Sequence, residues 1–307
     1  MDSKMAVYAG SGCPAAGPLD CNDDSCGTQS TVQFSITSGS TYTIQLGNWP
    51  SAAGAAGTFA IAVYVPPPPC SIATGPDVIV GVANDHLLNF PMESIPDWCV
   101  GTAARWRGPA EWFRDWVNIA PYEVAGEREL ARHIVRHAGR SGFNLAFSDR
   151  LEFDDNWSVP LKFLTPDYGV PLVPIHMNCV VPPLPQPQRC YEFGTVLADA
   201  VRAWPAQARV AIMATGGLSH DPGGPRYFAV DEKFDRWFLE LLGTGDAQRV
   251  LRELTIEKMI AAGDGGTVEL LAWIVALGAA GGRAAQTDFY VPSVPLRCGM
   301  GGVSWAV

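Results

Sequence analysis

The chain has 307 residues, of which 48% are hydrophobic and 17% are charged, and its formal net charge is −10. This composition excludes an intrinsically disordered protein and leaves room for one large globular domain, or for one domain and a smaller piece. The negative charge argues against nucleic acid or an anionic membrane surface as the main partner, because both would repel the chain.

The first 66 residues have the composition of a small β-rich segment. They hold a single basic residue, Lys4, no histidine, and many Gly, Ser, Thr and Ala. β-Branched and aromatic residues predict short strands at 32–36, 42–46 and 58–65, with Gly and Ser clusters between them. The segment lacks the charged start and the apolar run of a signal peptide, which predicts a cytoplasmic location.

The cysteines give conflicting indications of the compartment. Four of the eight lie within the first 70 residues, where disulfide pairing would suit an oxidising compartment and hints at an exported origin for this segment. The other four are scattered after residue 98, as is typical of buried thiols in a cytoplasmic enzyme. No CxxC pair occurs, so we expect no structural zinc site.

Four consecutive prolines, residues 66–69, separate two kinds of sequence. A polyproline run is stiff and cannot join the interior of a sheet, so we predict a linker at 67–75 between the segment 1–66 and a domain at 76–307. After the linker, strands are predicted at 77–83, 144–147, 172–178 and 208–215, and helices at 127–137, 193–204, 231–242, 246–262 and 268–277. This alternation predicts a layered α/β/α domain with a central mixed sheet, preceded by a small β-rich segment.

Two histidines follow predicted strands, where sites lie in open α/β sheets. His86 ends the run Asn84-Asp85-His86 after the strand 77–83, and His220 follows the run Gly216-Gly217-Leu218-Ser219 after the strand 208–215. Paired glycines let the backbone turn sharply and approach a ligand closely. From spacing alone, a polar residue in a solvated loop is the plainer interpretation of each histidine.

Glu269 opens the predicted apolar helix 268–277 after a glycine-rich turn. An acid in the first turn of a helix often does no more than interact with the helix dipole. The alternative is a carboxylate that faces a buried site near histidines, because two histidines and one carboxylate on one face of iron(II) leave open positions for substrate and oxygen. The apolar stretch itself, 268–280, is too short to span a bilayer.

Four stretches of the chain carry a family resemblance. In order, "PDVIVGVANDHLLNFPMESIPDWCVGTA", "VPIHMNCVVPPLPQPQRCYEFG", "MATGGLSHDPGGPR" and "GGTVELLAWIVALGA" closely resemble the class III extradiol dioxygenases, with protocatechuate 4,5-dioxygenase catalytic subunits and gallate dioxygenases as the most similar members. The resemblance runs from about Pro76 to the C-terminus. Separately, "CNDDSCGTQSTVQFSITSGSTYTIQLGNW" resembles part of a bacterial pre-peptidase C-terminal β-sandwich.

The resemblance implies roles for the residues that match the family's motifs. His86 and Glu269 match iron ligands, so Fe(II) is the implied cofactor, and His220 matches the acid–base residue. The residues beside them are expected to surround the metal or the substrate: Asn84, Asp85, Asp155, Gly216, Gly217 and Ser219. The implied reaction is extradiol cleavage of a catechol-type aromatic acid, such as protocatechuate or gallate, by O2. The implied assembly is a homodimer or a pairing with a small helical subunit.

Two departures from the family pattern lead us to expect weak iron binding and low activity. The family's second iron histidine lies on a first strand well before His86, yet residues 1–85 contain no histidine. Asp155 also stands where many relatives carry a histidine near the substrate. Two alternatives therefore stay open: a catalytically inactive binding or regulatory module with the dioxygenase fold, and an extracellular binding module led by the N-terminal segment.

Overall fold

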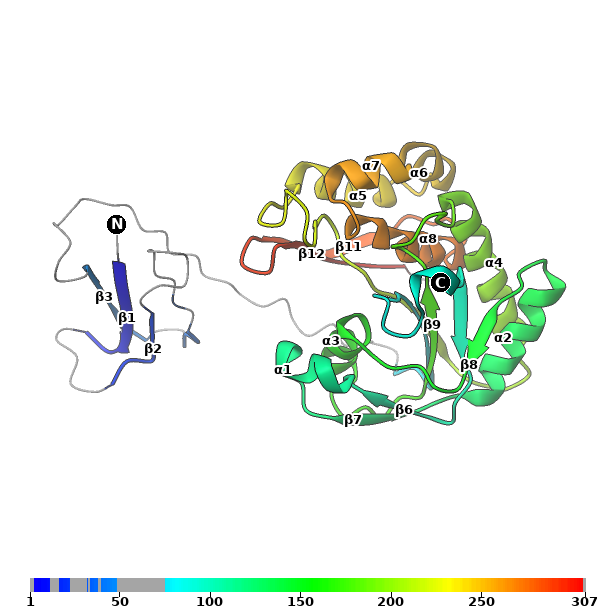
Figure 1. The fold of residues 1–307 in the computed structure, drawn as a ribbon, viewed down its shortest axis with the longest axis horizontal. Helices are drawn as coiled ribbons and strands as arrows, with labels where there is room; N and C mark the ends of the chain where they lie inside the picture. The colour runs from blue at the N-terminus through cyan, green and yellow to red at the C-terminus, as the bar shows by residue number, and fades with distance from the viewer. Residues whose placement is uncertain are drawn as a thin grey trace. The chain divides into compact units, whose positions relative to one another are not determined.

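The computed structural model describes residues 3–11, 17–22, 32, 34–37, 40–48 and 75–305 (Figure 1). The chain divides into two compact units, Met1–Val65 and Pro66–Val307. No helix of the described residues is both long and apolar enough to cross a membrane.

The first unit contains a three-stranded antiparallel sheet in the order β2-β1-β3. Its strands are β1 (Ser3–Ala9), β2 (Asp20–Asn22) and β3 (Tyr42–Asn48). The predicted strand at 42–46 lies within β3, whereas β1 was not predicted. The prediction of a strand at 32–36 is wrong for the residues described there: the ring of Phe34 packs on Tyr42 at 5.3 Å instead. The predicted strand at 58–65 lies outside the described residues.

The second unit is built on a five-stranded mixed sheet, as the sequence predicted. Its strands, in spatial order, are β10 (Val210–Ala214), β4 (Val78–Asn84), β9 (Leu172–Met177), β5 (Trp98–Gly101) and β8 (Ala146–Ser148). The first three are parallel, β5 is antiparallel to β9, and β8 is parallel to β5. The carboxyl ends of β10, β4 and β9 therefore lie at one end of the sheet, and those of β5 and β8 lie at the other.

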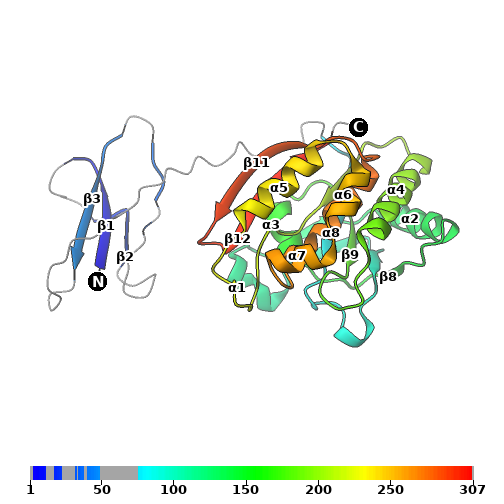
Figure 2. The same cartoon turned by 90° about the horizontal axis from the view of Figure 1, so that it is seen from above.

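Helices and two short hairpins complete the second unit (Figure 2). The helices are α1 (Arg114–Val117), α2 (Arg128–Arg140), α3 (Asp155–Leu164), α4 (Pro187–Ala203), α5 (Glu232–Gly243), α6 (Ala247–Glu253), α7 (Ile256–Ala262) and α8 (Leu270–Ala279). Three 3-10 turns lie at Met92–Ser94, Glu111–Phe113 and Thr267–Glu269. The hairpins pair β6 (Arg105–Gly108) with β7 (Tyr122–Ala125), and β11 (Gln286–Ser293) with β12 (Cys298–Ser304).

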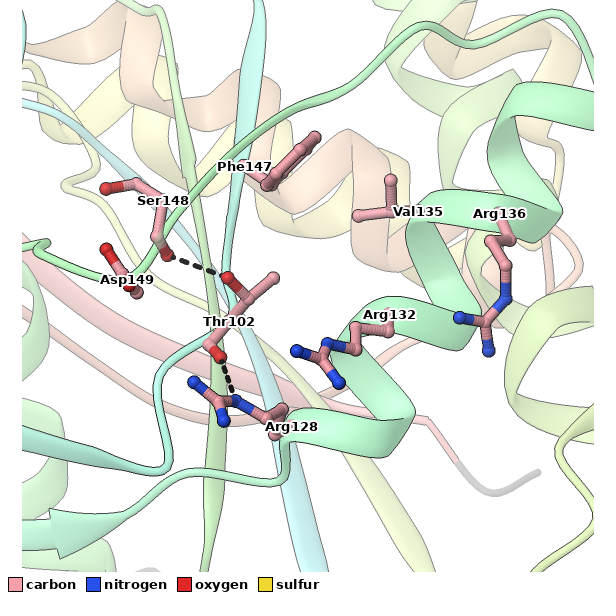
Figure 3. A pocket seen from close by; sticks show the side chains of 8 residues that line it. All are labelled: Thr102, Arg128, Arg132, Val135, Arg136, Phe147, Ser148 and Asp149. Atoms are coloured by element: carbon pink, nitrogen blue, oxygen red, sulfur yellow. Dashed lines mark hydrogen bonds between the residues drawn. The ribbon is translucent and has the colours of Figure 1, made fainter.

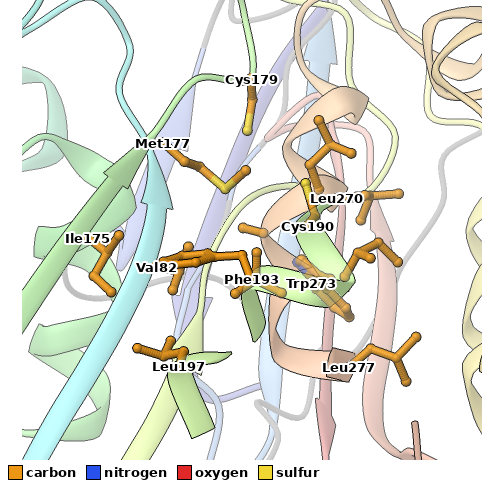
Figure 4. Close-up of a cluster of buried hydrophobic side chains, with 14 of the residues drawn as sticks. Val82, Ile175, Met177, Cys179, Cys190, Phe193, Leu197, Leu270, Trp273 and Leu277 are labelled. Carbon is orange, nitrogen blue, oxygen red and sulfur yellow. The ribbon is translucent and has the colours of Figure 1, made fainter. Parts of the chain in front are cut away.

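The central strand β4 is buried along all seven of its residues. Because side chains alternate across a strand, Val78, Val80 and Val82 join the core beneath α2, α4 and α8, part of which Figure 4 shows. Ile79 and Ala83 join a second core on the opposite face, with residues of α3. Burial on both faces explains why the sequence of this strand is a continuous apolar run.

Helices α4 and α8 cross with their backbones in contact. A Cβ atom on Gly194 of α4 would lie 2.0 Å from the carbonyl oxygen of Val275, and one on Gly278 of α8 would lie 2.1 Å from that of Tyr191. Every residue of α8 from Leu270 to Gly278 is buried. This close crossing fixes the start of α8, and with it Glu269, beside the sheet.

The helix predicted at 246–262 is in fact two helices. Helix α6 ends at Glu253, and the side chain of Thr255 then caps α7 by accepting a hydrogen bond from the backbone N–H of Lys258 at 3.2 Å. A Thr at an N-cap starts a new helix because it satisfies a donor that has no partner within that helix. Helix α4 also begins earlier than the predicted residue 193, at Pro187.

The four scattered cysteines are free thiols. Cys99, Cys179 and Cys190 are buried and Cys298 is half-buried, which confirms the prediction for three of them and places the fourth at the edge of the core. Cys21 is free and exposed. The other three early cysteines lie outside the described residues.

Candidate active site

The imidazole of His86 lies between carboxylates that come from different elements. Its Nε2 is 2.7 Å from Oε1 of Glu269, and its Nδ1 is 3.0 Å from Oδ2 of Asp154 and 3.4 Å from Oδ1 of Asp155. The side chain of His86 is 31% exposed, whereas those of Glu269 and Asp154 are 3% and 1% exposed. Asp155 is 30% exposed, so His86 and Asp155 are the accessible members of the cluster, and Glu269 and Asp154 are its buried members.

Glu269 is the last residue of the 3-10 turn that leads into α8. Its Oε1 accepts a hydrogen bond from Nδ2 of Asn84 at 3.1 Å, and its Oε2 accepts one from the backbone N–H of Gly217 at 2.9 Å. The carboxylate therefore ties together the ends of β4 and β10 and the start of α8. A role limited to the helix dipole does not account for these contacts.

In this cluster His86 and Glu269 shift each other's pKa toward the charged form. Burial alone would raise the pKa of Glu269, but the hydrogen bond and charge of His86, the charge of His220 and the N–H of Gly217 outweigh it and lower the pKa to about 2. Burial alone would lower the pKa of His86, yet its contacts with Asp154, Asp155 and Glu269 raise the pKa well above the usual value. Positive charge is therefore favoured at the centre of the cluster.

His220 reaches the cluster through the glycine loop after β10. A Cβ on Gly217 would lie 2.4 Å from Cε1 of His220, and one on Gly216, whose φ is +140°, would lie 2.7 Å from Cβ of Glu269. The backbone N–H of His220 donates to Oγ1 of Thr267 at 3.2 Å, in the turn that carries Glu269. The structure thus brings His86, His220 and Glu269 together around one place.

A backbone carbonyl sets the tautomer of His220. Nδ1 lies 2.9 Å from the carbonyl oxygen of Leu218, which can only accept, so Nδ1 carries the proton. In the neutral ring, Nε2 then holds the free lone pair. A Cβ on Gly266 would lie 2.6 Å from Nε2, so only a glycine leaves room for the ring there.

Asn84 and Asp85, which precede His86 in the sequence, have different partners. Asn84 contacts Glu269 and accepts a hydrogen bond from the backbone N–H of Cys179 at 3.1 Å. Asp85 points elsewhere: it bonds Nδ1 of His176 at 3.1 Å and the backbone N–H of Asn89. His176 is buried. Asp85 therefore fastens the loop that follows His86.

Ser219 directly precedes His220, as Asp85 directly precedes His86, and it too fastens the loop of its histidine. Its Oγ donates to Oδ2 of Asp235 at 2.9 Å and accepts from the backbone N–H of Asp231 at 2.8 Å. Its own backbone N–H donates to Oδ1 of Asp235 at 2.8 Å. Ser219 is fully buried, and these contacts anchor the loop to the start of α5.

The start of α3 supplies residues that the sequence analysis missed. Asp154 caps this helix by accepting from the backbone N–H of Asn156 at 3.0 Å through Oδ1, while its Oδ2 faces His86. The side-chain amide of Asn156 lies 3.4 Å from Nε2 of His86. Asp155, expected near the substrate, lies beside Nδ1 of His86. An aspartate before a helix is explained locally as a cap, so its sequence gave no signal for a second contact.

The donor set fits a divalent cation. Ligand atoms of His86, Asp154 and Asp155 lie within 4.8 Å of one another, and Glu269 contacts the other nitrogen of the same imidazole. Three carboxylates around one imidazole leave an excess of negative charge that a dication would neutralise. Imidazole and carboxylate are ligands that suit iron(II).

Comparisons with known proteins give several matches. Residues 61–297 match the family model described as the catalytic LigB subunit of aromatic ring-opening dioxygenase. Among curated relatives, a gallate dioxygenase of Pseudomonas putida is 31% identical over 176 residues, which cover 56% of this chain and 51% of the relative. A 2,3-dihydroxyphenylpropionate/2,3-dihydroxicinnamic acid 1,2-dioxygenase of Escherichia coli is 32% identical over 195 residues, which cover 62% and 58%.

The chain thus spans about half the length of the curated relatives it matches. A solved structure of an uncharacterized protein from Escherichia coli K12 has a similar fold, with a TM-score of 0.50 and 16% sequence identity. The similarity covers 75% of this chain and 86% of that one. At this identity the likeness supports the fold alone.

Proposed function

Because the chain belongs to the family of catalytic subunits of aromatic ring-opening dioxygenases, we propose that residues 76–307 catalyse extradiol cleavage of a catechol-type aromatic acid by O2 with iron(II). The observation that carries this proposal is the convergence of His86, His220 and Glu269 from three distant parts of the sequence. The names of the relatives support the substrate class, because gallate and dihydroxyphenylpropionate are both aromatic acids with neighbouring hydroxyl groups.

In this proposal His86 and Glu269 hold the iron. Asp154, on the opposite nitrogen of His86, keeps the ring oriented and increases its basicity, as carboxylate partners of metal-bound histidines do. The chemistry that iron(II) supplies when bound is to hold the phenolic oxygens and O2 at one centre and to carry electron density between them.

In the proposal, residues of the protein transfer the proton and orient the metal-binding carboxylate. His220 uses Nε2 to take a phenolic proton when the catechol binds, and returns it as the ring opens. Asn84 and the backbone N–H of Gly217 hold the carboxylate of Glu269 in one orientation. In the balanced reaction a ring bond beside one hydroxyl carbon breaks and both oxygen atoms of O2 enter the product. One carbon of that bond becomes a carboxylate, and the other becomes an aldehyde where it carried hydrogen or a second carboxylate where it carried a hydroxyl group.

The segment 154–156 bears on the expectation of weak iron binding, which assumed two ligands only. Asp154 and Asp155 add two carboxylates around His86, and the amide of Asn156 lies beside Nε2. We propose that their negative charge, which makes the imidazole of His86 a stronger ligand at its other nitrogen, compensates in part for the histidine that residues 1–85 lack. Iron binding should then be measurable in the isolated chain.

The test is anaerobic loading with iron(II), followed by oxygen uptake with gallate or protocatechuate. We expect uptake that is lost in Glu269→Gln together with iron binding, and lost in His220→Gln with iron binding retained. Glu192→Gln, which removes the same charge from an exposed position on α4, is the matched control and should behave as the parent chain. Full uptake by both site variants would overturn the proposal.

The alternative of a binding module without catalysis is favoured by one observation, the lack of any histidine before His86. The same experiment separates the two. A chain that binds iron(II) and a catechol acid but consumes no oxygen is such a module.

A further inference from the structure

A second candidate binding place lies at the other end of the sheet from His86. It is a cavity of about 500 Å³ between α2 and the carboxyl ends of β5 and β8 (Figure 3). Three arginines, Arg128, Arg132 and Arg136, line it together with Phe147 and Asp149. We call it the α2 arginine pocket.

The register of the sheet separates this pocket from the candidate active site. On β4 and β9, Asn84 pairs with Met177 at the end that carries His86, and Trp98 at the start of β5 lies opposite Met177. Gly101, at the far end of β5, pairs with Ser148 of β8. Thr102 and Asp149, which follow those two residues and line the pocket, are therefore at the opposite end.

The arginines form one stripe, because residues four apart lie on the same face of a helix. Arg128 donates from Nε to the carbonyl oxygen of Thr102 at 3.0 Å, which fixes its guanidinium beside the end of β5 (Figure 3). Arg132 has only a long contact of 3.5 Å with Glu129. Within the part of the chain that the structure describes, no carboxylate lies within ion-pair distance of Arg136.

The charge of the pocket is opposite to that of the protein. Three arginines and one aspartate give it a formal charge of +2, in a chain with a net charge of −10. A ligand with two negative charges would match this, and guanidinium groups bind planar carboxylates through paired hydrogen bonds.

Phe147 adds an aromatic wall. Its side chain, on the edge strand β8, is 66% exposed, and the ring borders the cavity beside the arginines (Figure 3). An aromatic ring next to guanidinium groups favours a flat, conjugated ligand over a flexible or tetrahedral anion.

We propose that the α2 arginine pocket binds a small, planar, conjugated dicarboxylate. The identification of a biological ligand rests on the proposed function. Opening the ring of a catechol acid adds a second carboxylate, so the product of that reaction is a conjugated dicarboxylate. The pocket would thus bind product away from the place where it forms.

The test measures binding of isophthalate, a stable planar dicarboxylate, to the full chain without metal by isothermal titration calorimetry. We expect Arg132→Gln and Arg136→Gln each to weaken binding about tenfold or more, as the loss of a charge-assisted hydrogen bond does. Arg140→Gln, on the same helix but outside the pocket, is the matched control and should bind as the parent chain does. Circular dichroism checks that the variants are folded.

Two further probes fix the ligand class. Phe147→Ala should weaken binding of isophthalate more than binding of succinate, which has the same charge but is flexible. Inorganic phosphate should bind more weakly than isophthalate to the parent chain.

Three outcomes would overturn the proposal: no binding of isophthalate, equal binding by the Arg136 variant, or phosphate binding as tight as that of isophthalate. Loss of isophthalate binding in Glu269→Gln would also do so, because it would place the ligand at the candidate active site. None of these measurements uses iron or oxygen. A failure of the pocket proposal therefore leaves the proposed dioxygenase function untouched, and a failed oxygen-uptake test leaves the measured binding of isophthalate untouched.

Discussion

Gly217 occupies a position that a larger residue could fill only by moving His220. A Cβ there would lie 2.4 Å from Cε1 of that ring, and the backbone N–H of Gly217 also donates to Glu269. The residue therefore sets the distance between the proposed base and the proposed metal ligand, although it carries no side chain of its own.

We expect Gly217→Ala to lower the rate of ring cleavage by about 100-fold, because a shift of the base by about 1 Å has effects of that size. The chain should stay folded. Oxygen uptake under saturating substrate measures the rate, and Gly139→Ala is the control, since a Cβ at Gly139 meets nothing within 4 Å. Equal rates in the two variants would contradict a positioning role.

Asp154 offers a second residue-level test, because it has two separable tasks. Asp154→Asn keeps the cap of α3, since asparagine caps a helix as well as aspartate does, but it removes the charge that faces His86. We expect affinity for cobalt(II), a spectroscopic substitute for iron(II), to fall roughly 10–100-fold. Asp199→Asn on the exposed face of α4 is the control. Unchanged affinity would mean that Asp154 serves the helix alone.

Local pattern marked His86, His220 and Glu269 only as candidates, with a solvated loop the plainer interpretation of each histidine, and the family resemblance supplied the proposed roles. His86 and His220 follow strands, and Glu269 is an acid at the start of an apolar helix, so each stands out in the sequence. Asp154 and Asn156 do not, because a capping aspartate is already explained by the helix that it begins. Their contacts with His86 depend on how α3 packs against β4, which no local pattern records.

At the scale of elements, the crossing of α4 and α8 depends on two glycines that face each other's helix. Gly194 and Gly278 each leave room for a carbonyl oxygen of the other helix at about the distance of direct contact. Any side chain at either position would push the helices apart. Such a shift would also move the core residues of α8 that pack on β4 and β10, and Glu269, which directly precedes α8.

We therefore expect Gly194→Ala to lower the free energy of unfolding by about 1–3 kcal/mol, as overpacking in a core does, even though alanine favours a helix. Urea denaturation followed by circular dichroism measures the change. Gly139→Ala, in the exposed part of α2, should instead raise stability by about 0.5–1 kcal/mol. If Gly194→Ala were as stable as Gly139→Ala, the crossing would have to be looser than its geometry implies.

The elements themselves were predictable where a long apolar or β-rich run marks them. Strands β4 and β9 are buried along their whole length and appear as apolar runs. The hairpin of β11 and β12 is partly exposed, and β5 has only four residues, so neither has a strong pattern. The break between α6 and α7 depends on one capping threonine inside a stretch that otherwise favours helix.

At the scale of the whole molecule, all residues of the candidate site and of the five-stranded sheet belong to the second unit, Pro66–Val307. Both hydrophobic clusters are also drawn from residues of that unit. A unit with its own core and its own site is expected to fold and function alone. Within its described residues, the first unit has a separate three-stranded sheet and contributes to neither of these hydrophobic clusters.

We expect a fragment of residues 66–307 to unfold at the same temperature as the main transition of the full chain, and to bind cobalt(II) with the same affinity. The physical reason is that the carboxylates around His86 and the helices that support them are all retained. Scanning calorimetry and metal titration of the two proteins, side by side, measure this. A fragment that melts well below the full chain, or loses the metal, would contradict this independence.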